Sequence, residues 1–245
     1  MIKRQIFDNE DQWLLERDKV FTSSEVNRLM ADVERSMTES EIEAYKKAEP
    51  KGRRKNIIDR SLLSDGAITY ILEKIAASYG AREPIFFNSE MAWGKENEGA
   101  AVLELCNKLK LDTSSSDVIY TSSGGNVIWM SDKYGGTPDV DFPKLKANAE
   151  IKCPNTKTHL YYKAFVNAKN IQNKLPKYYD QMQLNMHLTN AEMCYFFSYD
   201  PRLSGNLESH TIEVIRDQAR IDLILDKIEI AHAFKMNLIK KFNES

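Results

Sequence analysis

The stretch from Thr137 to Lys152 constrains the fold and chemistry of this chain more than any other. It reads TPDVDFPKLKANAEIK, with a proline–aspartate pair, Pro138-Asp139, and an acid-x-lysine triplet, Glu150-Ile151-Lys152, on either side of a short reversal. Such a reversal joins neighbouring strands and brings their side chains together. Carboxylate oxygens are ligands that Mg²⁺ prefers, and a lysine beside them can assist a water that attacks a phosphodiester. The stretch therefore predicts a β-sheet that carries a metal-dependent hydrolytic site.

Strand periodicity assigns a direction to each of these side chains. Alternate residues of a strand share a face, so Glu150 and Lys152 should point toward Asp139 while Ile151 points into the core. The main-chain carbonyl of Ile151 is a further oxygen ligand for a hard cation. Lys152 would orient or deprotonate the attacking water and stabilise charge on the phosphate oxygens. Asp141 is either a rival ligand or a surface acid.

A helix predicted from Trp93 to Leu109 carries an unexpected carboxylate on its apolar side. One turn before its apolar stripe, which runs from Ala101 to Leu109, the same face reaches Glu98. An inward-facing glutamate needs a partner because an unpaired buried charge is costly. The partner is either a lysine or arginine or, given the site above, a shared metal ion.

Composition indicates one ordinary globular domain. The chain has 245 residues, of which 42% are hydrophobic and 29% charged, enough to bury one large core. No apolar run approaches the roughly 18 residues of a membrane span, and the N-terminus lacks the apolar stretch of a secretory signal, so we expect a cytoplasmic protein without membrane contact. The cysteines Cys106, Cys153 and Cys194 are too scattered for a disulfide framework or a Cys-x-x-Cys metal site.

Basic residues are concentrated locally, although the formal net charge is −2. That balance argues against coating nucleic acid by bulk electrostatics. From Lys152 to Lys177 lysines alternate with aromatic residues and no acid occurs, and a second basic group spans 51–55. The first run is either a solvated lysine face or a track for DNA, and its position after the acidic site favours DNA.

The pattern of elements predicts a mixed architecture. Helices are expected to begin near Ser23 or Ser24 and to cover 61–79, 93–109, 176–188 and 217–242. Strands are expected at 118–120 and 127–130 around a turn at 122–126, and at 149–152, 193–199 and 211–215. Residues 31–60 are highly charged and expected to be mobile. This order predicts one α/β (α+β) domain over residues 1–245, a mixed central β-sheet flanked by helices.

Several short motifs resemble one known family when they are taken in order. These are the segments 91–98, Thr137-Pro138-Asp139, 150–154, 178–183 and 195–202. Together they resemble the phage lambda exonuclease family of recombination nucleases, also called the YqaJ type, over residues 13–202. A Pro-Asp pair followed by Glu-x-Lys is a weak signal by itself, whereas the ordered set is specific.

The resemblance implies a restriction-endonuclease-like core, the PD-(D/E)xK type, that uses Mg²⁺, with Mn²⁺ expected to substitute. It implies digestion of double-stranded DNA from 5′ ends to mononucleotides, which leaves a 3′ strand for a single-strand annealing protein, by a homotrimeric ring of bacteriophage type. By position, Asp139, Glu150 and Lys152 match the catalytic trio, Glu98 matches a carboxylate near the metal, and Gln181 matches an active-site glutamine.

The resemblance also implies a receptor for a terminal 5′-phosphate. Arg17, Thr22 and Ser24 fall on an arginine and hydroxyl residues of the family's N-terminal motif, and Thr137 stands where a serine is common. A guanidinium fork with hydroxyls and a helix N-terminus suits a phosphate dianion. The alternative for Thr22 and Ser24 is simple N-capping. Tyr178 is expected to contact DNA.

Two departures and two other functions remain open at this level. The charged segment at 31–60 is longer than the family leads us to expect, and the cysteines are too few for the roughly four thiolates of an iron–sulfur cluster. One alternative function is a restriction-like or structure-specific endonuclease, which would cut closed circular DNA. The other is a non-catalytic DNA-binding module, against which the intact carboxylates and lysine count.

Overall fold

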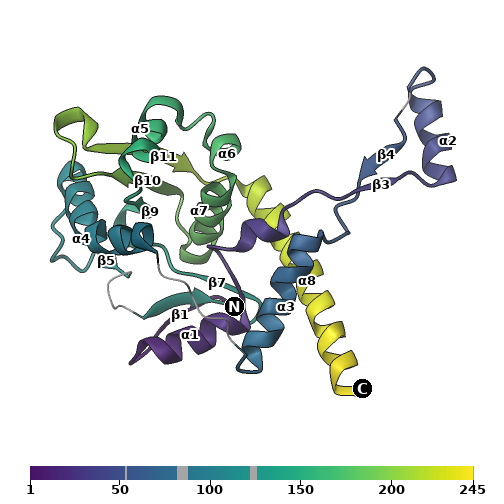
Figure 1. Cartoon of the computed structure of the whole chain (residues 1–245), viewed down its shortest axis with the longest axis horizontal. Helices are drawn as coiled ribbons and strands as arrows, with labels where there is room; N and C mark the ends of the chain where they lie inside the picture. Colours follow the sequence, from purple (N-terminus) through teal and green to yellow (C-terminus); the bar gives the residue numbers. More distant parts are fainter. Residues whose placement is uncertain (53, 82–87, 122–125, 245) are drawn as a thin grey trace.

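Apolar strands from the second half of the chain build the central sheet. The computed structural model describes residues 1–52, 54–81, 88–121 and 126–244 (Figure 1). Within them the central sheet has the strand order β11-β10-β9-β8-β5. Its strands are β5 (Ile119–Tyr120), β8 (Val140–Phe142), β9 (Ala147–Lys152), β10 (Met193–Tyr199) and β11 (Ser209–Ile215). β9 and β10 are parallel and the other neighbours antiparallel, so the sheet is mixed.

Helices cover both faces of this sheet. Ala149 and Ile151 of β9 pack in one cluster with α4 (Ser89–Leu109). Phe196 of β10 packs in another with α5 (Thr156–Phe165) and α7 (Pro176–Thr189). Because side chains alternate along a strand, Glu150 and Lys152 face the side of α7. The prediction that Ile151 points into the core is confirmed by its exposure of 4%.

A second sheet, with the order β1-β6-β7-β2, carries the N-terminal part of the chain (Figure 1). Its strands are β1 (Lys3–Ile6), β2 (Phe21–Thr22), β6 (Val127–Met130) and β7 (Tyr134–Gly136). Trp13 of α1 (Glu10–Lys19) packs against Ile128 and Met130. Phe21 and Trp129 share a core cluster with α3 (Asp65–Ser78) and α8 (Gln218–Glu244).

The four long helices predicted from the sequence are confirmed as α3, α4, α7 and α8, with ends that shift by a few residues. Ser64 and Asn88 cap α3 and α4 by accepting main-chain N–H groups, and Pro176 opens α7. The apolar stripe of α8 packs into the protomer's own core. The remaining helices are η1 (Val26–Leu29), α2 (Glu39–Ala48), η2 (Pro143–Leu145), α6 (Ile171–Lys174) and η3 (Gly205–Leu207). Across the described ranges, no helix has the length and apolarity to cross a bilayer.

Two local predictions are wrong. No α-helix begins at Ser23 or Ser24: Thr22 belongs to β2, Ser23 N–H donates to Gly135 O, and only the short 3₁₀ helix η1 follows. The strands around 118–120 and 127–130 do not form a hairpin, because β5 pairs with β8 whereas β6 pairs with β1 and β7. Of the turn expected at 122–126, residues 122–125 lie outside the described residues.

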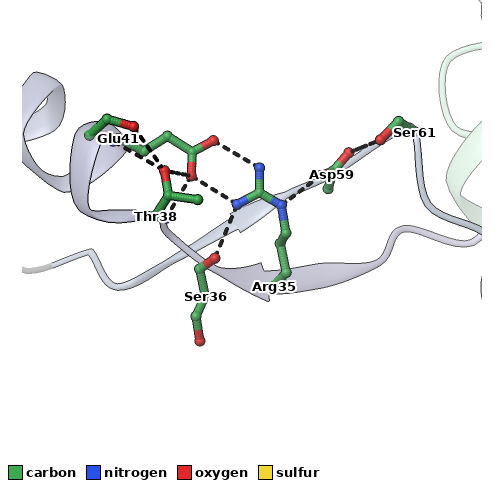
Figure 2. A network of polar contacts seen from close by, with 7 residues as sticks. Arg35, Ser36, Thr38, Glu41, Asp59 and Ser61 are labelled. Carbon is green, nitrogen blue, oxygen red and sulfur yellow. Dashed lines mark hydrogen bonds and ion pairs between the residues drawn. The ribbon is translucent and has the colours of Figure 1, made fainter.

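Residues 31–60 form an arm that projects from the body (Figure 1). β3 (Glu34–Ser36) pairs with β4 (Asn56–Ile58), and α2 lies between them in the chain. Figure 2 shows the polar network at its base, in which the Arg35 guanidinium donates to both Glu41 oxygens at 2.8 Å and to Asp59 at 2.6 Å. Glu41 also forms a capping box with Thr38. The arm therefore has a defined local structure, and its mobility stays a prediction.

We predict that Arg35→Gln loosens the arm without destabilising the body. The substitution leaves Glu41 and Asp59 without their shared cation, and none of the arm's described residues is buried in the core. Hydrogen exchange should quicken in peptides from 34–48, while the melting temperature of the whole protein should not change. Arg54→Gln is the matched control, because Arg54 on the same arm donates to the main-chain carbonyl of Asn56. Equal exchange in both variants would contradict the prediction.

Candidate active site

The junction of β8 and β9 brings together the acids predicted from the sequence. Asp139 directly precedes β8, and its N–H donates to Ala149 O on β9. The Asp139 carboxylate in turn accepts the N–H of Ile151 at 2.6 Å. Glu150 follows Ala149 on β9, in register with Phe196 of the parallel strand β10. The predicted meeting of Asp139 with Glu150 and Lys152 is therefore formed by sheet pairing.

Glu150 is the most deeply buried group of the site. Its exposure is 0%, and its two carboxylate oxygens have different partners. Oε1 forms an ion pair with the ammonium of Lys152, and Oε2 accepts from Gln181 Nε2 at 2.8 Å. Gln181 comes from α7, which covers this face of the sheet. The active-site position predicted for Gln181 is thus occupied by a direct donor to the central carboxylate.

The electrostatics reflect a cluster of acids around one lysine. Burial, followed by the neighbouring charge of Glu150, raises the pKa of the Asp139 carboxyl well above its ordinary value. Burial alone would lower the pKa of the Lys152 ammonium, but the charges of Glu150 and Asp139 outweigh it and raise that pKa. Lys152 is therefore held as a cation. In this state it donates protons in hydrogen bonds and stabilises negative charge, and it is not a base.

Glu98 reaches the same cluster from α4. It is half-buried, its Oε1 accepts from the hydroxyl of Tyr120 at 3.3 Å, and its charge adds to the rise in the pKa of Asp139. The structure describes no lysine or arginine in an ion pair with Glu98 within the ranges given above, which favours the metal-linked alternative. Tyr120 was missed from the sequence, because no motif marks a hydroxyl that supports a carboxylate.

The donor chemistry of the cluster fits a hard divalent cation. Asp139, Glu150 and Glu98 supply carboxylates and Ile151 a carbonyl, the set expected from the sequence. Among the described residues, no three acidic, histidine or cysteine side chains converge closely enough to hold an ion as they stand. Lys152 and the Ile151 N–H now bind the Glu150 and Asp139 oxygens. Binding an ion therefore requires these oxygens to exchange partners.

Residues of the predicted phosphate receptor share one cavity with the catalytic acid. A cavity of about 370 Å³ is lined by Arg17, Thr22, Ser24 and Thr137 together with Asp139 and Gln181. Arg17 Nη2 donates to Ser24 Oγ at 3.0 Å, and Thr137 Oγ1 donates to Val127 O at 2.7 Å. Neither Thr22 nor Ser24 is an N-cap, because η1 begins after Glu25 and has no side-chain cap. The N-capping alternative is therefore wrong, and so is the expected helix N-terminus.

A second cavity opens on the other side of Lys152. It has a volume of about 610 Å³, and Glu98, Ile151, Lys152 and Tyr178 are among its lining residues. The Lys152 ammonium lies 5.0 Å from the centre of the Tyr178 ring. Tyr178 therefore lies beside the catalytic lysine and not in the receptor cavity. Lys95, which lines both cavities, was missed, although it lies one turn before Glu98 on the same helix.

The remaining sequence features around the site divide between core and surface. Tyr162 and Tyr179 of the basic, aromatic run are buried, and Lys163 donates to Ser209 O, so part of that run is structural. Asp141 has an exposure of 7% and is not a surface acid, and burial raises its pKa to about 6. It lines neither of the two cavities. Cys106, Cys153 and Cys194 are buried free thiols.

A family model described as the YqaJ-like viral recombinase domain matches residues 12–192. The chain belongs to this family. The family match confirms the resemblance drawn from the motifs and the expected enzyme class, a nuclease. No curated protein sequence matches the chain.

Solved structures resemble this YqaJ-like chain over nearly its whole length. An alkaline exonuclease (LHK-Exo) from Laribacter hongkongensis is 22% identical, with 96% of each chain covered and a TM-score of 0.64. LHK-Exo in complex with dAMP is 23% identical, with 96% of each chain covered and a TM-score of 0.65. A phage related exonuclease from Haemophilus somnus 129PT is 16% identical over 91% of this chain and 96% of that chain, with a TM-score of 0.65. At these identities the likeness shows the fold, and it confirms the predicted α+β class.

We predict that Gly136→Ala disrupts the wall of the receptor cavity. A Cβ at this position would lie 2.4 Å from both Asn185 Oδ1 and Ser23 Oγ, so β7 and α7 would have to separate. The free energy of unfolding should fall by about 1–3 kcal/mol, measured by urea denaturation. Gly99→Ala is the control: its Cβ would meet open space on α4, and this variant should gain up to about 1 kcal/mol. Equal stability of the two variants would contradict the close packing at Gly136.

Proposed function

We propose that this YqaJ-like nuclease is a Mg²⁺-dependent exonuclease that digests one strand of linear duplex DNA in the 5′ to 3′ direction. It releases mononucleotides and leaves 3′ single-stranded overhangs. One observation carries the proposal: Arg17, Thr22 and Ser24 line the same cavity of about 370 Å³ as Asp139. Guanidinium and hydroxyl donors suit a terminal phosphate dianion, and a carboxylate across the cavity suits cleavage at the next phosphodiester. A phosphate held at one wall therefore selects a DNA end.

The chain's own residues divide the work at the cleavage point. The carboxylates of Asp139, Glu150 and Glu98 and the carbonyl of Ile151 would hold Mg²⁺, with Mn²⁺ an expected substitute. When bound, the ion supplies Lewis acidity and lowers the pKa of water. Lys152, held as an ammonium by its acidic neighbours, donates hydrogen bonds to the attacking water and to the phosphate oxygens. Gln181 fixes the direction of the Glu150 carboxylate.

The second cavity suits the strand on the far side of the cleaved bond. Lys152 and Tyr178 line it, and Tyr178 has an aromatic face on which a base can stack. A strand that enters beside Tyr178 and ends at Arg17 would pass Asp139 and Lys152 on its way. This path uses all the residues predicted for DNA contact.

Family membership supports two further parts of the proposal. The protein assembles as a homotrimeric ring around duplex DNA, and it delivers the 3′ overhang to a single-strand annealing protein. Both partners are needed in the cytoplasm, the bacterial cytoplasm if the chain is encoded by a phage.

The proposal is tested with one plasmid in two forms, covalently closed and linearised with 5′-phosphate ends. With Mg²⁺ present, release of acid-soluble nucleotides is expected from the linear form alone, and EDTA should stop it. End-labelling at either terminus then gives the polarity. Nicking or cutting of the closed circle would overturn the exonuclease assignment in favour of an endonuclease. No release from either form would favour a non-catalytic module.

We predict that Lys152→Ala lowers the cleavage rate by about 100-fold or more while duplex binding stays nearly intact. The ammonium is close to Glu150 at the centre of the site, whereas many other groups contribute to DNA affinity. Single-turnover release and a gel-shift titration measure the two effects. Lys157→Ala, which removes an exposed lysine of α5 nearby, should change neither. Full activity of Lys152→Ala would remove this lysine from the mechanism.

A further inference from the structure

Three buried lysines lie behind the two sheets, outside the catalytic cluster. Lys74, Lys227 and Lys235 have exposures of 8%, 2% and 7%. A buried ammonium is costly unless it is hydrogen-bonded, and each of these donates to a main-chain carbonyl. Lys227 donates to Leu62 O at 3.1 Å. The other two converge on the C-terminal end of α1, the helix that carries Arg17.

The end of α1 explains why two cations gather there. The last carbonyls of a helix lack partners within the helix and lie at the negative end of its dipole. Lys74 of α3 donates to Arg17 O at 3.1 Å, and Lys235 of α8 donates to Lys19 O at 2.8 Å. Two helices from the core thus fix the final turn of α1. The Arg17 side chain leaves this turn, lies over the Trp13 ring at 4.9 Å and donates to Ser24.

Tyr70 makes the corresponding contact to the other wall of the receptor cavity. It lies one helical turn before Lys74 on α3 and has an exposure of 2%. Its hydroxyl accepts the N–H of Thr22 at 2.9 Å and lies 3.3 Å from Thr22 Oγ1. The Lys74 ammonium lies 5.7 Å from the centre of the Tyr70 ring. A single face of α3 therefore contacts both Thr22 and the backbone of Arg17.

We propose that Tyr70 and Lys74 of α3 are positioning residues for the terminal phosphate: they hold Thr22 and Arg17 in the arrangement that distinguishes a 5′-phosphorylated end from a 5′-hydroxyl end. This inference rests on the proposed function, which assigns Arg17, Thr22 and Ser24 to the terminal phosphate. Neither positioning residue is among those that line the cavity, so both act through residues that do.

Lys74 also adds positive charge behind Arg17. Burial, followed by the charge of Arg17, lowers the pKa of the Lys74 ammonium to about 8. The charged and titratable groups that act on it from the packed elements are Arg17, Asp18, Glu25, Tyr70, Glu73 and Lys235. The group is cationic below this pKa and neutral above it. The positive potential behind the receptor should therefore decrease as the pH rises through about 8.

The experiment compares linear duplexes that differ only in a 5′-phosphate or a 5′-hydroxyl. The readout is the ratio of kcat/KM on the two ends, which cancels any general loss of activity. Lys74→Met removes the ammonium and keeps an apolar stem, and Tyr70→Phe removes only the hydroxyl. Lys227→Met is the matched control, because it removes an equally buried lysine with the same kind of hydrogen bond, to Leu62 O.

The ratio should fall about tenfold in Lys74→Met and about fivefold in Tyr70→Phe. The loss should appear as a higher KM for the phosphorylated end with kcat nearly unchanged, since a terminal phosphate is bound equally before and during cleavage. Lys227→Met should keep the wild-type ratio even where its melting temperature falls. An unchanged ratio in folded Lys74→Met or in Tyr70→Phe would overturn the inference, and Tyr70→Phe decides the question if Lys74→Met does not fold.

The pH dependence separates positioning from general stability. The wild-type ratio should fall as the pH rises through about 8, whereas the ratio of Lys74→Met should be flat over the same range. Parallel profiles for the two proteins would count against the role of Lys74. Equal rates of the wild type on both ends would instead overturn the proposed assignment of the receptor itself. Failure of the proposed function and failure of this inference are thus distinguishable.

Discussion

The buried carboxylate of Glu150 is the constraint on which the catalytic half of the structure depends. A charge with an exposure of 0% is tolerated only with close partners, and the chain supplies them from two elements. Lys152 comes from the same strand and Gln181 from α7, so β9 and α7 must pack closely. The parallel pairing of β9 with β10 holds that strand in the middle of the sheet. The geometry of the site and the packing of the core are therefore one problem with one solution.

The second half of the site depends on a different device. The walls of the receptor cavity come from β2 and α1, which are short elements at the edge of the second sheet. They are held from behind by long, well-packed helices. Tyr70 contacts Thr22, and Lys74 contacts the carbonyl of Arg17. In this way residues that contribute no surface to the cavity fix those that do.

Local patterns in the sequence were enough to predict the catalytic strands, and long-range pairing was not. Alternation along 149–152 gave the directions of Glu150 and Lys152, and the apolar stripe of α4 gave Glu98, because both are periodic features of one element. The separation of β5 and β6 into different sheets could not be predicted, since adjacent strands usually pair. The roles of Tyr70 and Lys74 were equally hidden, because a tyrosine and a lysine on a helix carry no signal of burial.

The wide separation of the site residues along the chain has a consequence for synthesis. Arg17, Glu98, Asp139, Glu150 and Gln181 meet only after β9 has neighbours on both sides, and β10 at Met193–Tyr199 is one of them. Domains form from such non-local contacts only when the distant segments are available. A chain still attached to the ribosome before β10 emerges therefore lacks a complete cleavage site. The host's DNA is exposed only to finished copies of the protein, and a truncated product has no cutting activity to restrain.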